Sequence, residues 1–232
     1  MRRNRKKRFK SHQGRTLITD LNPSSPIAEQ YRTIRTNISF SAVDDKINTL
    51  MVTSSNPSEG KSLTTANLAI VFAQQGSSVL LVDADLRKPT LHYTLQKSNT
   101  LGLSNYLVGA QTIESIVHNT SIDNLHAVTS GPIPPNPSEL LGSKSMGNFI
   151  EESKHIYDVI IFDTPPVLAV TDSQILSSLC DGTILVTRNK QTEIDEARRA
   201  KKLLAQTNGR LLGTILNDAE RKKENYYYYY GN

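Results

Sequence analysis

A loop of eight residues, Ser55–Ser62, lies between an apolar segment and a segment with helical spacing. Its sequence, SNPSEGKS, matches the phosphate-binding P-loop pattern except at the first position, where Ser55 replaces glycine. Backbone N–H groups at a helix N-terminus converge with the helix dipole on phosphate oxygens. In such a loop Lys61 reaches the outer phosphates, the Ser62 hydroxyl holds Mg²⁺, and Gly60 leaves room for the phosphate. The alternative is a chance GKS at a strand–turn–helix corner.

Carboxylates stand directly after two other apolar segments. Asp83 and Asp85 follow VLLV, and Asp163 closes VIIFD. Ligands of open α/β sheets bind at the carboxyl ends of the strands, so we expect these side chains near the loop. Asp163 suits a magnesium shell, and the two carboxylates at 83 and 85 suit metal positioning together with proton acceptance. Taken singly, each is also explained by a cap or a solvated turn. Combined with the loop, they indicate binding of a nucleoside triphosphate with Mg²⁺.

Strand and helix patterns alternate along the chain and must position these groups. The apolar segments that predict strands cover residues 49–54, 79–83, 125–129, 159–163, 182–187 and 211–216. Helical spacing is found after Ser25-Pro26 and over 62–75, 105–119, 138–141, 146–155, 172–179 and 193–206. Strands that are apolar throughout, separated by helices, predict an α/β fold. We expect a mostly parallel sheet with helices on both faces, the three-layer α/β/α form of P-loop NTPases.

The charge of the chain is unevenly placed. Of 27 lysines and arginines, eight lie in the first 15 residues, which leaves 19 basic against 22 acidic side chains in residues 16–232. The body is therefore mildly acidic, with a basic arm, and we expect no nucleic-acid partner. The one cysteine excludes a disulfide framework, and no apolar run is long enough to cross a bilayer or to act as a secretion signal. These features predict a cytoplasmic protein.

Five of the nine tyrosines form one unbroken run near the end of the chain: Tyr226, Tyr227, Tyr228, Tyr229 and Tyr230. The residues around this run give no apolar support for a core strand. We therefore predict three parts: a flexible basic arm over 1–23, a P-loop domain over 24–217, and a flexible tyrosine-rich tail over 218–232. Stacking of the tyrosines on a partner is the alternative to modification.

This combination resembles the bacterial protein-tyrosine kinases (BY-kinases) of capsule and exopolysaccharide synthesis, in the form whose cytoplasmic kinase is a separate polypeptide. Ser55–Ser62 resembles the Walker A motif, Leu80–Arg87 the family's Walker A′ motif, and Val159–Asp163 the Walker B motif. The Gly131–Pro137 loop and the spacing Glu29-x-x-Arg32-x-x-Arg35 also look like family elements. The resemblance implies the fold of deviant P-loop ATPases related to cell-division and partitioning proteins.

The resemblance also implies phosphoryl transfer from ATP to protein tyrosine, with Mg²⁺ as the cofactor ion. It assigns catalysis to Lys61, Asp83 and Asp85, with Asp83 as the acceptor of the tyrosine proton. Spacing alone does not decide whether Asp83 or Asp85 has this role. The metal ligands it implies are Ser62, Asp83 and Asp163. Asn217 contacts adenine by analogy with the fold. The expected nucleotide-binding residues are Asn56, Pro57, Ser58, Glu59, Gly60, Lys61, Ser62, Leu63 and Asn217.

Partners are likewise implied by the resemblance. They are a transmembrane activator, a cognate phosphotyrosine phosphatase, exogenous tyrosine-containing proteins and further copies of the chain in a ring. The ring contacts fall on Glu29, Arg32 and Arg35, whose alternative explanation is a surface pair at i,i+3. The activator places the protein at the inner face of the membrane, where the basic arm is either an auxiliary tether or an inert start.

Autophosphorylation in trans is the modification that the resemblance implies for the tail. It opens the ring by adding negative charge. The expected sites are the five tyrosines of the run, Tyr226, Tyr227, Tyr228, Tyr229 and Tyr230.

Two competing functions remain. A partitioning-type switch ATPase needs a second lysine four residues before the loop glycine, and this chain has Asn56 there. The tyrosine run also argues against that function. A non-catalytic ATP-binding regulatory subunit is less favoured because Lys61, Asp83, Asp85 and Asp163 are all present.

Overall fold

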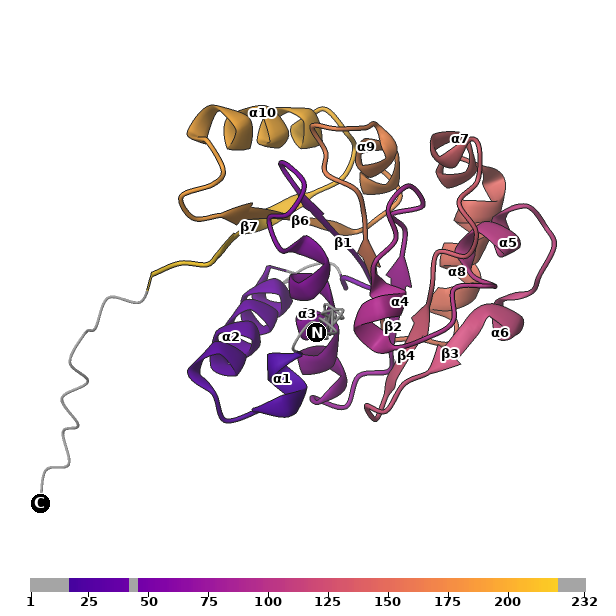
Figure 1. The fold of residues 1–232 in the computed structure, drawn as a ribbon, viewed down its shortest axis with the longest axis horizontal. Coiled ribbons are helices and arrows are strands. Elements are labelled where there is room, and N and C mark those ends of the chain that lie inside the picture. The colour runs from indigo at the N-terminus through magenta and orange to yellow at the C-terminus, as the bar shows by residue number, and fades with distance from the viewer. Residues whose placement is uncertain (1–16, 42–45, 221–232) are drawn as a thin grey trace, which may run out of the picture.

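Seven strands form one sheet in the order β3-β4-β2-β5-β1-β6-β7, with helices on both faces (Figure 1). The computed structural model describes residues 17–41 and 46–220. Neighbouring strands are parallel, except that β3 runs antiparallel to β4. This confirms the predicted α/β class. The strands are β1 (Thr49–Ser54), β2 (Val79–Asp83), β3 (Val117–Asn119), β4 (Leu125–Val128), β5 (Val159–Asp163), β6 (Gly182–Arg188) and β7 (Leu211–Asn217).

Ten helices connect and cover these strands within the described residues. They are α1 (Ile18–Leu21), α2 (Pro26–Phe40), α3 (Lys61–Ala73), α4 (Leu91–Leu95), α5 (Leu103–Leu107), α6 (Ile113–Ile116), α7 (Pro137–Leu141), α8 (Lys144–Lys154), α9 (Asp172–Ser177) and α10 (Ile194–Ala205). In the part of the chain that the structure describes, none of them is both long and apolar enough to span a bilayer.

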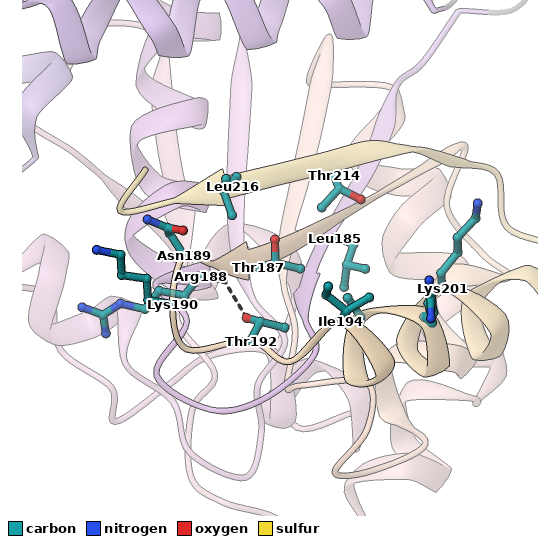
Figure 2. Close-up of a pocket in the computed structure, with 12 residues that line it drawn as sticks. Leu185, Thr187, Arg188, Asn189, Lys190, Thr192, Ile194, Lys201, Thr214 and Leu216 are labelled. Atoms are coloured by element: carbon teal, nitrogen blue, oxygen red, sulfur yellow. Dashed lines mark hydrogen bonds between the residues drawn. The ribbon is translucent and has the colours of Figure 1, made fainter. Parts of the chain in front are cut away.

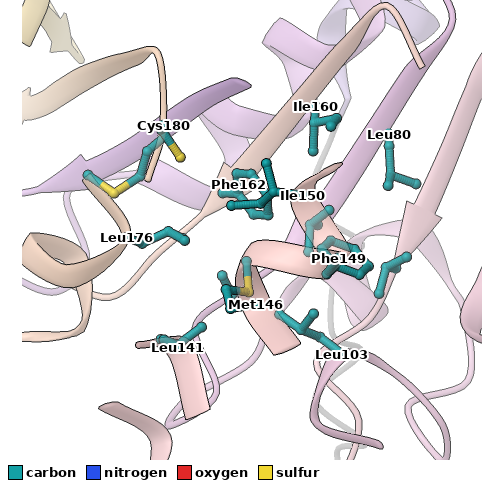
Figure 3. Packing of buried hydrophobic residues seen from close by; sticks show 14 of the residues in the cluster. Leu80, Leu103, Leu141, Met146, Phe149, Ile150, Ile160, Phe162, Leu176 and Cys180 are labelled. Atoms are coloured by element: carbon teal, nitrogen blue, oxygen red, sulfur yellow. The ribbon is translucent and has the colours of Figure 1, made fainter. Parts of the chain in front are cut away.

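Two apolar cores lie on opposite faces of the sheet because side chains of a strand alternate between faces. In β5, Ile160 and Phe162 join the core beneath α5 and α8–α10, whereas Ile161 joins the core beneath α2 and α3. Figure 3 shows the first of these cores, where Phe149 of α8 packs close to Phe162. Strands buried on both faces read as continuous apolar runs, which is why the sequence revealed them.

Helix α3 is buried nearly all round, from Thr64 to Ala73. It lies between the sheet and α2, so no face of it is left for charged residues. Its alanines allow this close packing. The consequence for function is that the start of α3, and with it the loop after β1, has a fixed position relative to the sheet.

The predicted boundary of the basic arm at residue 23 was wrong. Residues 18–21 form α1, and Thr19 is fully buried against α3. The backbone N–H of Thr19 donates to Oδ1 of Asn67 at 3.0 Å, and its hydroxyl donates to the same oxygen at 2.8 Å. A buried amide on α3 needs such partners, and sequence spacing did not indicate where they come from. The basic residues of the arm lie outside the described residues.

Two further predictions of local structure were wrong. Residues 105–119 do not form one helical stretch, because α5 and α6 are followed by β3, which pairs with β4. The spacing of Ile27, Tyr31, Ile34 and Ile38 also predicts one apolar stripe along the helix after Pro26, which is α2 in the structure. Ile38 is buried there, whereas Ile27 is 47% exposed, so the stripe does not meet the core along its whole length.

Candidate active site

The loop between β1 and α3 carries two residues in the left-handed backbone conformation. Ser58 has φ of 67° and Gly60 has φ of 88°. Such a loop turns backbone N–H groups toward one concave side, the arrangement that binds phosphate. A Cβ on Gly60 would lie 2.1 Å from Nδ2 of Asn217, so a larger residue would displace this amide and would also be strained by the left-handed backbone. Ser55 is not among the left-handed residues of the described chain, which explains why serine is tolerated where the pattern has glycine.

Contacts from distant residues hold this loop in shape. The carboxylate of Glu59, itself buried, accepts from the Asn56 N–H at 3.0 Å and from the Thr192 hydroxyl at 2.5 Å. The Asn56 side chain donates to Glu196 of α10 at 2.7 Å. Asn217, at the end of β7, donates to the Glu59 carbonyl at 3.0 Å. These bonds offset the left-handed conformation of Ser58, which costs a residue other than glycine roughly 1–2 kcal/mol.

Lys61 lies among the carboxylates that the sequence predicted to converge. Its Nζ is 3.0 Å from Oδ1 of Asp163 and 3.2 Å from Oδ2 of Asp85. Burial lowers the pKa of Lys61, but attraction by Asp163, then Asp85 and Asp83, outweighs it and leaves this pKa above the ordinary value. Lys61 is therefore a charged ammonium inside the protein, poised for an anionic ligand.

Asp163 closes β5 and is completely buried. Its Oδ1 accepts from Lys61, and its Oδ2 has no hydrogen-bond partner. Burial raises the pKa of this carboxyl, against the opposing effect of Lys61. An orphaned, buried carboxylate oxygen is rare in a folded protein and fits a cation ligand.

The described residues contain no cluster of three or more histidine, cysteine or acidic side chains arranged to hold a metal. Mg²⁺ at phosphate sites is usually held by one or two protein groups together with phosphate and water. Two of the three predicted ligands, Ser62 and Asp163, fit that pattern, since the hydroxyl and the orphaned oxygen lie at the same end of the sheet. Metal binding by Ser62, Asp83 and Asp163 stays a prediction.

Asp83 closes β2 beside Asp163, and their Cα atoms are register partners. Its Oδ2 accepts from the N–H groups of Thr90 and Leu91 at 3.0 and 2.9 Å. Burial, and then repulsion by Asp163, raises the pKa of Asp83 to about 7. A carboxylate whose pKa lies near the working pH is suited to accept and release a proton.

Arg87 is fixed by a residue that the sequence analysis missed. Its guanidinium makes two bonds to the buried carboxylate of Asp172, Nε–Oδ2 at 2.9 Å and Nη2–Oδ1 at 3.0 Å, and a third to Ser138. The segment that carries Asp83 and Asp85 is thereby joined to α7 and α9. Asp172 is the first residue of α9. Acidic residues are common in the first turn of a helix, so its sequence position gave no sign of this role.

Comparison with known proteins assigns the chain to a family. The family model described as an AAA domain matches residues 48–204. Tyrosine-protein kinase YwqD of Bacillus subtilis is 48% identical over 231 residues, which cover 100% of this chain and 96% of YwqD. Putative tyrosine-protein kinase CapB of Staphylococcus aureus is 40% identical, with 90% and 92% covered. The chain belongs to the bacterial tyrosine-protein kinases. The crystal structure of the chimerical protein CapA2B2 matches it with a TM-score of 0.86 at 41% identity, covering 88% of this chain and 90% of that one.

In this tyrosine kinase Asn217 lines a cavity of about 530 Å³ between α2 and β7. Tyr31 and Thr64 line the same cavity. Asn217 therefore contacts both the phosphate loop and the cavity, which lies beside the loop. Its predicted contact with adenine stays a prediction.

The three residues predicted to make ring contacts lie on α2, and all three form contacts within the kinase. Arg32 pairs with Glu29 at 2.7 Å, and Arg35 donates to the carbonyl of Val71 at 2.9 Å. The ring contacts stay a prediction.

The tyrosines predicted to be phosphorylated lie outside the described residues, so no contact of theirs bears on the site geometry. Their modification therefore stays a prediction. The residues concerned are Tyr226, Tyr227, Tyr228, Tyr229 and Tyr230.

Proposed function

We propose that this chain is an ATP-dependent protein-tyrosine kinase that phosphorylates its own tyrosine run in trans and thereby regulates capsular or exopolysaccharide synthesis. One observation carries the proposal. A charged, buried Lys61 lies beside Asp163, with its orphaned oxygen, and beside Asp83, whose pKa is about 7. Phosphate binding, cation binding and proton acceptance therefore meet at one end of the sheet. Membership of the tyrosine-kinase family supports the same reaction.

The mechanism assigns one task to each group. The loop amides and Lys61 hold the phosphates and neutralise charge on the transferred group. Asp83 accepts the proton of the tyrosine hydroxyl, whose oxygen forms a bond to the γ-phosphorus as the bond to the bridging oxygen of ADP breaks. Ser62 and Asp163 would hold Mg²⁺, which would supply further neutralisation of the phosphate charge. Asp85, paired with Lys61, keeps the ammonium directed toward the site.

The length of the chain permits transfer either within one copy or between copies. The end of β7 lies four strand spacings from the end of β2, about 19 Å. Tyr226 is nine residues beyond Asn217, a reach of up to about 31 Å when extended. Transfer in trans is therefore a separate part of the proposal and needs its own test.

The test uses two variants of the full chain. Lys61→Met keeps the tyrosines and loses the lysine, whereas a chain ending at Glu220 keeps the site and loses the tyrosines. Incubated with ATP and Mg²⁺, neither is expected to gain phosphotyrosine alone. Mixed, they are expected to label Lys61→Met, which shows transfer in trans. Label in the wild type but not in the mixture means transfer within one copy. No label in the wild type, with or without an activator segment, contradicts the kinase proposal.

The resemblance supports the remaining proposals. They are a transmembrane activator that holds the kinase at the inner face of the membrane, a cognate phosphatase, exogenous tyrosine-containing substrates and a ring that opens when the tails are phosphorylated. Phosphates on three tyrosines add roughly −5 charges, more than the net −3 of residues 16–232. Light scattering before and after ATP treatment tests the ring, and equal size in both states contradicts its opening.

A further inference from the structure

The connection between β6 and α10 contacts the phosphate loop on one side and the residues after β7 on the other. Arg188, the last residue of β6, donates from Nη1 to the carbonyl of Ser58 at 3.1 Å. Its Nε donates to Oδ2 of Asp218 at 2.6 Å. One guanidinium therefore joins two segments that are 160 residues apart in sequence. Figure 2 shows Arg188, Asn189 and Lys190 at the end of β6, beside Leu216 of β7.

Residues 217–220, which we call the tail root, have further contacts with this connection. The N–H of Asn189 donates to the carbonyl of Asn217 at 2.9 Å, and its side chain donates to the carbonyl of Asp218 at 3.3 Å. Lys190 forms an ion pair with Glu220. Ordered contacts thus continue three residues past the predicted end of the domain at residue 217. The tail root leaves the body next to the phosphate loop.

Ser58 is the loop residue that most needs such support. It is the one residue of Ser55–Ser62 other than glycine with left-handed backbone, and its peptide carbonyl accepts from Arg188. Turning this peptide the other way would change the direction of the loop N–H groups that face phosphate. A donor on the Ser58 carbonyl therefore favours the conformation that binds nucleotide.

We propose that Arg188 is a positioning residue that couples the tail root to the phosphate loop, so that nucleotide binding and anchoring of the tail root strengthen each other. The inference rests on the nucleotide site proposed above. Coupling of two binding events is reciprocal. Nucleotide in the loop therefore stabilises the bonds of the tail root, and release of the tail root weakens nucleotide binding.

The two contacts of Arg188 contribute unequally. Its pair with Asp218 is a surface pair, with 40% and 53% of the side chains exposed, and such pairs contribute little by themselves. Its bond to Ser58 acts on the loop directly. Removal of the guanidinium should therefore weaken nucleotide binding more than removal of the Asp218 charge, which only holds the guanidinium in place.

The experiment measures binding of fluorescent ADP with Mg²⁺ to the full chain. Arg188→Ala is expected to raise the dissociation constant about tenfold, the scale of one lost hydrogen bond to a charged group. Asp218→Asn should raise it about threefold, and the double variant should match Arg188→Ala. Arg188→Lys should fall between the wild type and Arg188→Ala. The matched control is Arg198→Ala, which removes another surface arginine, paired with Asp195 on α10, and should change nothing.

Hydrogen exchange separates coupling from a merely structural role. In the wild type, ADP is expected to slow exchange at residues 217–220, and in Arg188→Ala it should not. The inference is overturned if the wild type and Arg188→Ala bind ADP with equal affinity. It is also overturned if ADP does not change the exchange rate at residues 217–220 of the wild type. If Arg188→Ala fails to fold, ADP affinity and hydrogen exchange at residues 217–220 are measured in Asp218→Asn instead, and the same outcomes support or overturn the inference. A wild type that binds no ADP instead contradicts the proposed function.

Discussion

Two groups of charges meet the phosphate loop, and they differ in burial. At the centre of the sheet Lys61, Asp83 and Asp163 are nearly or completely buried. At its edge the pairs Arg188–Asp218 and Lys190–Glu220 are 40–74% exposed. Water screens the exposed pairs, whereas the buried charges interact strongly and shift one another's pKa. The chemistry proposed for the site therefore depends on the buried group, and the exposed group adjusts it.

The largest effect is expected from Lys61→Met in the buried group. It removes the positive charge that balances three carboxylates and, in the proposed mechanism, contacts the phosphates, so transfer should fall at least about 1,000-fold. The folded protein should also lose about 3–5 kcal/mol or protonate a carboxylate instead. Phosphotyrosine formation and chemical denaturation measure the two effects. Lys154→Met is the control, because Lys154 pairs with Glu151 on the surface of α8. Similar losses in both variants would remove the distinction between the two groups.

Replacement of Asp83 comes next. Asp83→Ala should lower the rate of transfer by roughly 100- to 10,000-fold, the range for a positioned proton acceptor. ADP affinity should stay within a few-fold of the wild type, because Asp83 accepts from Thr90 and Leu91 and not from the loop. Initial rates and nucleotide titration measure the two quantities. Turnover near that of the wild type would contradict the assignment of Asp83 as proton acceptor.

The pKa of Asp83 also predicts how stability without nucleotide depends on pH. In the folded protein this pKa is about 7, against an ordinary value of 3.8, so the fold favours the protonated form. The stabilisation from this group is complete below pH about 4 and is lost as the pH rises through about 7. The loss is on the order of 4 kcal/mol at most.

Urea denaturation between pH 5 and 8 measures this dependence. The slope should flatten in Asp83→Asn, which does not titrate. The rate of transfer has the opposite trend and should rise through about pH 7, as Asp83 becomes able to accept a proton. An equal slope in wild type and Asp83→Asn would show that Asp83 is not the group responsible.

A smaller effect on ADP affinity is expected at Asn217, which lies between the buried and the exposed group of charges. Asn217→Ala removes one uncharged hydrogen bond to the Glu59 carbonyl and the side chain packed on Gly60. Such a bond contributes about 1 kcal/mol, so ADP affinity should fall about fivefold. Asn136→Ala, which removes a surface bond to Glu139, is the matched control. An unchanged affinity would show that the loop keeps its shape without β7.

The smallest effect belongs to the exposed group. Lys190→Ala should change the free energy of unfolding by less than about 0.5 kcal/mol, because both side chains of its pair with Glu220 are more than 70% exposed. In 0.5 M salt the difference from the wild type should disappear. Denaturation at low and high salt checks this. A larger, salt-independent loss would mean that the pair is shielded from water and belongs with the buried group.

Much of the fold was predictable because its signals are local. The apolar strands and the helix after Ser62 follow from patterns within ten to fifteen residues, and their order gives a parallel sheet. Short helices and strands were missed where their formation depends on contacts with residues far away in the sequence. Helix α1 exists because Thr19 meets Asn67, and β3 exists because Val117–Asn119 pair with β4.

The groups available for chemistry follow from the amino-acid sequence alone: a loop for phosphate, a lysine, and aspartates at the ends of two strands. Those features are local, and a parallel sheet brings strand ends together without further information. The pKa values of these groups and the shape of the loop depend instead on the folded chain as a whole. Burial sets the pKa of Asp83, and contacts between residues at least 130 positions apart, from Thr192 to Glu59 and from Arg188 to Ser58, set the shape of the loop. Burial and long-range contacts arise from packing of the whole chain, which no short segment encodes.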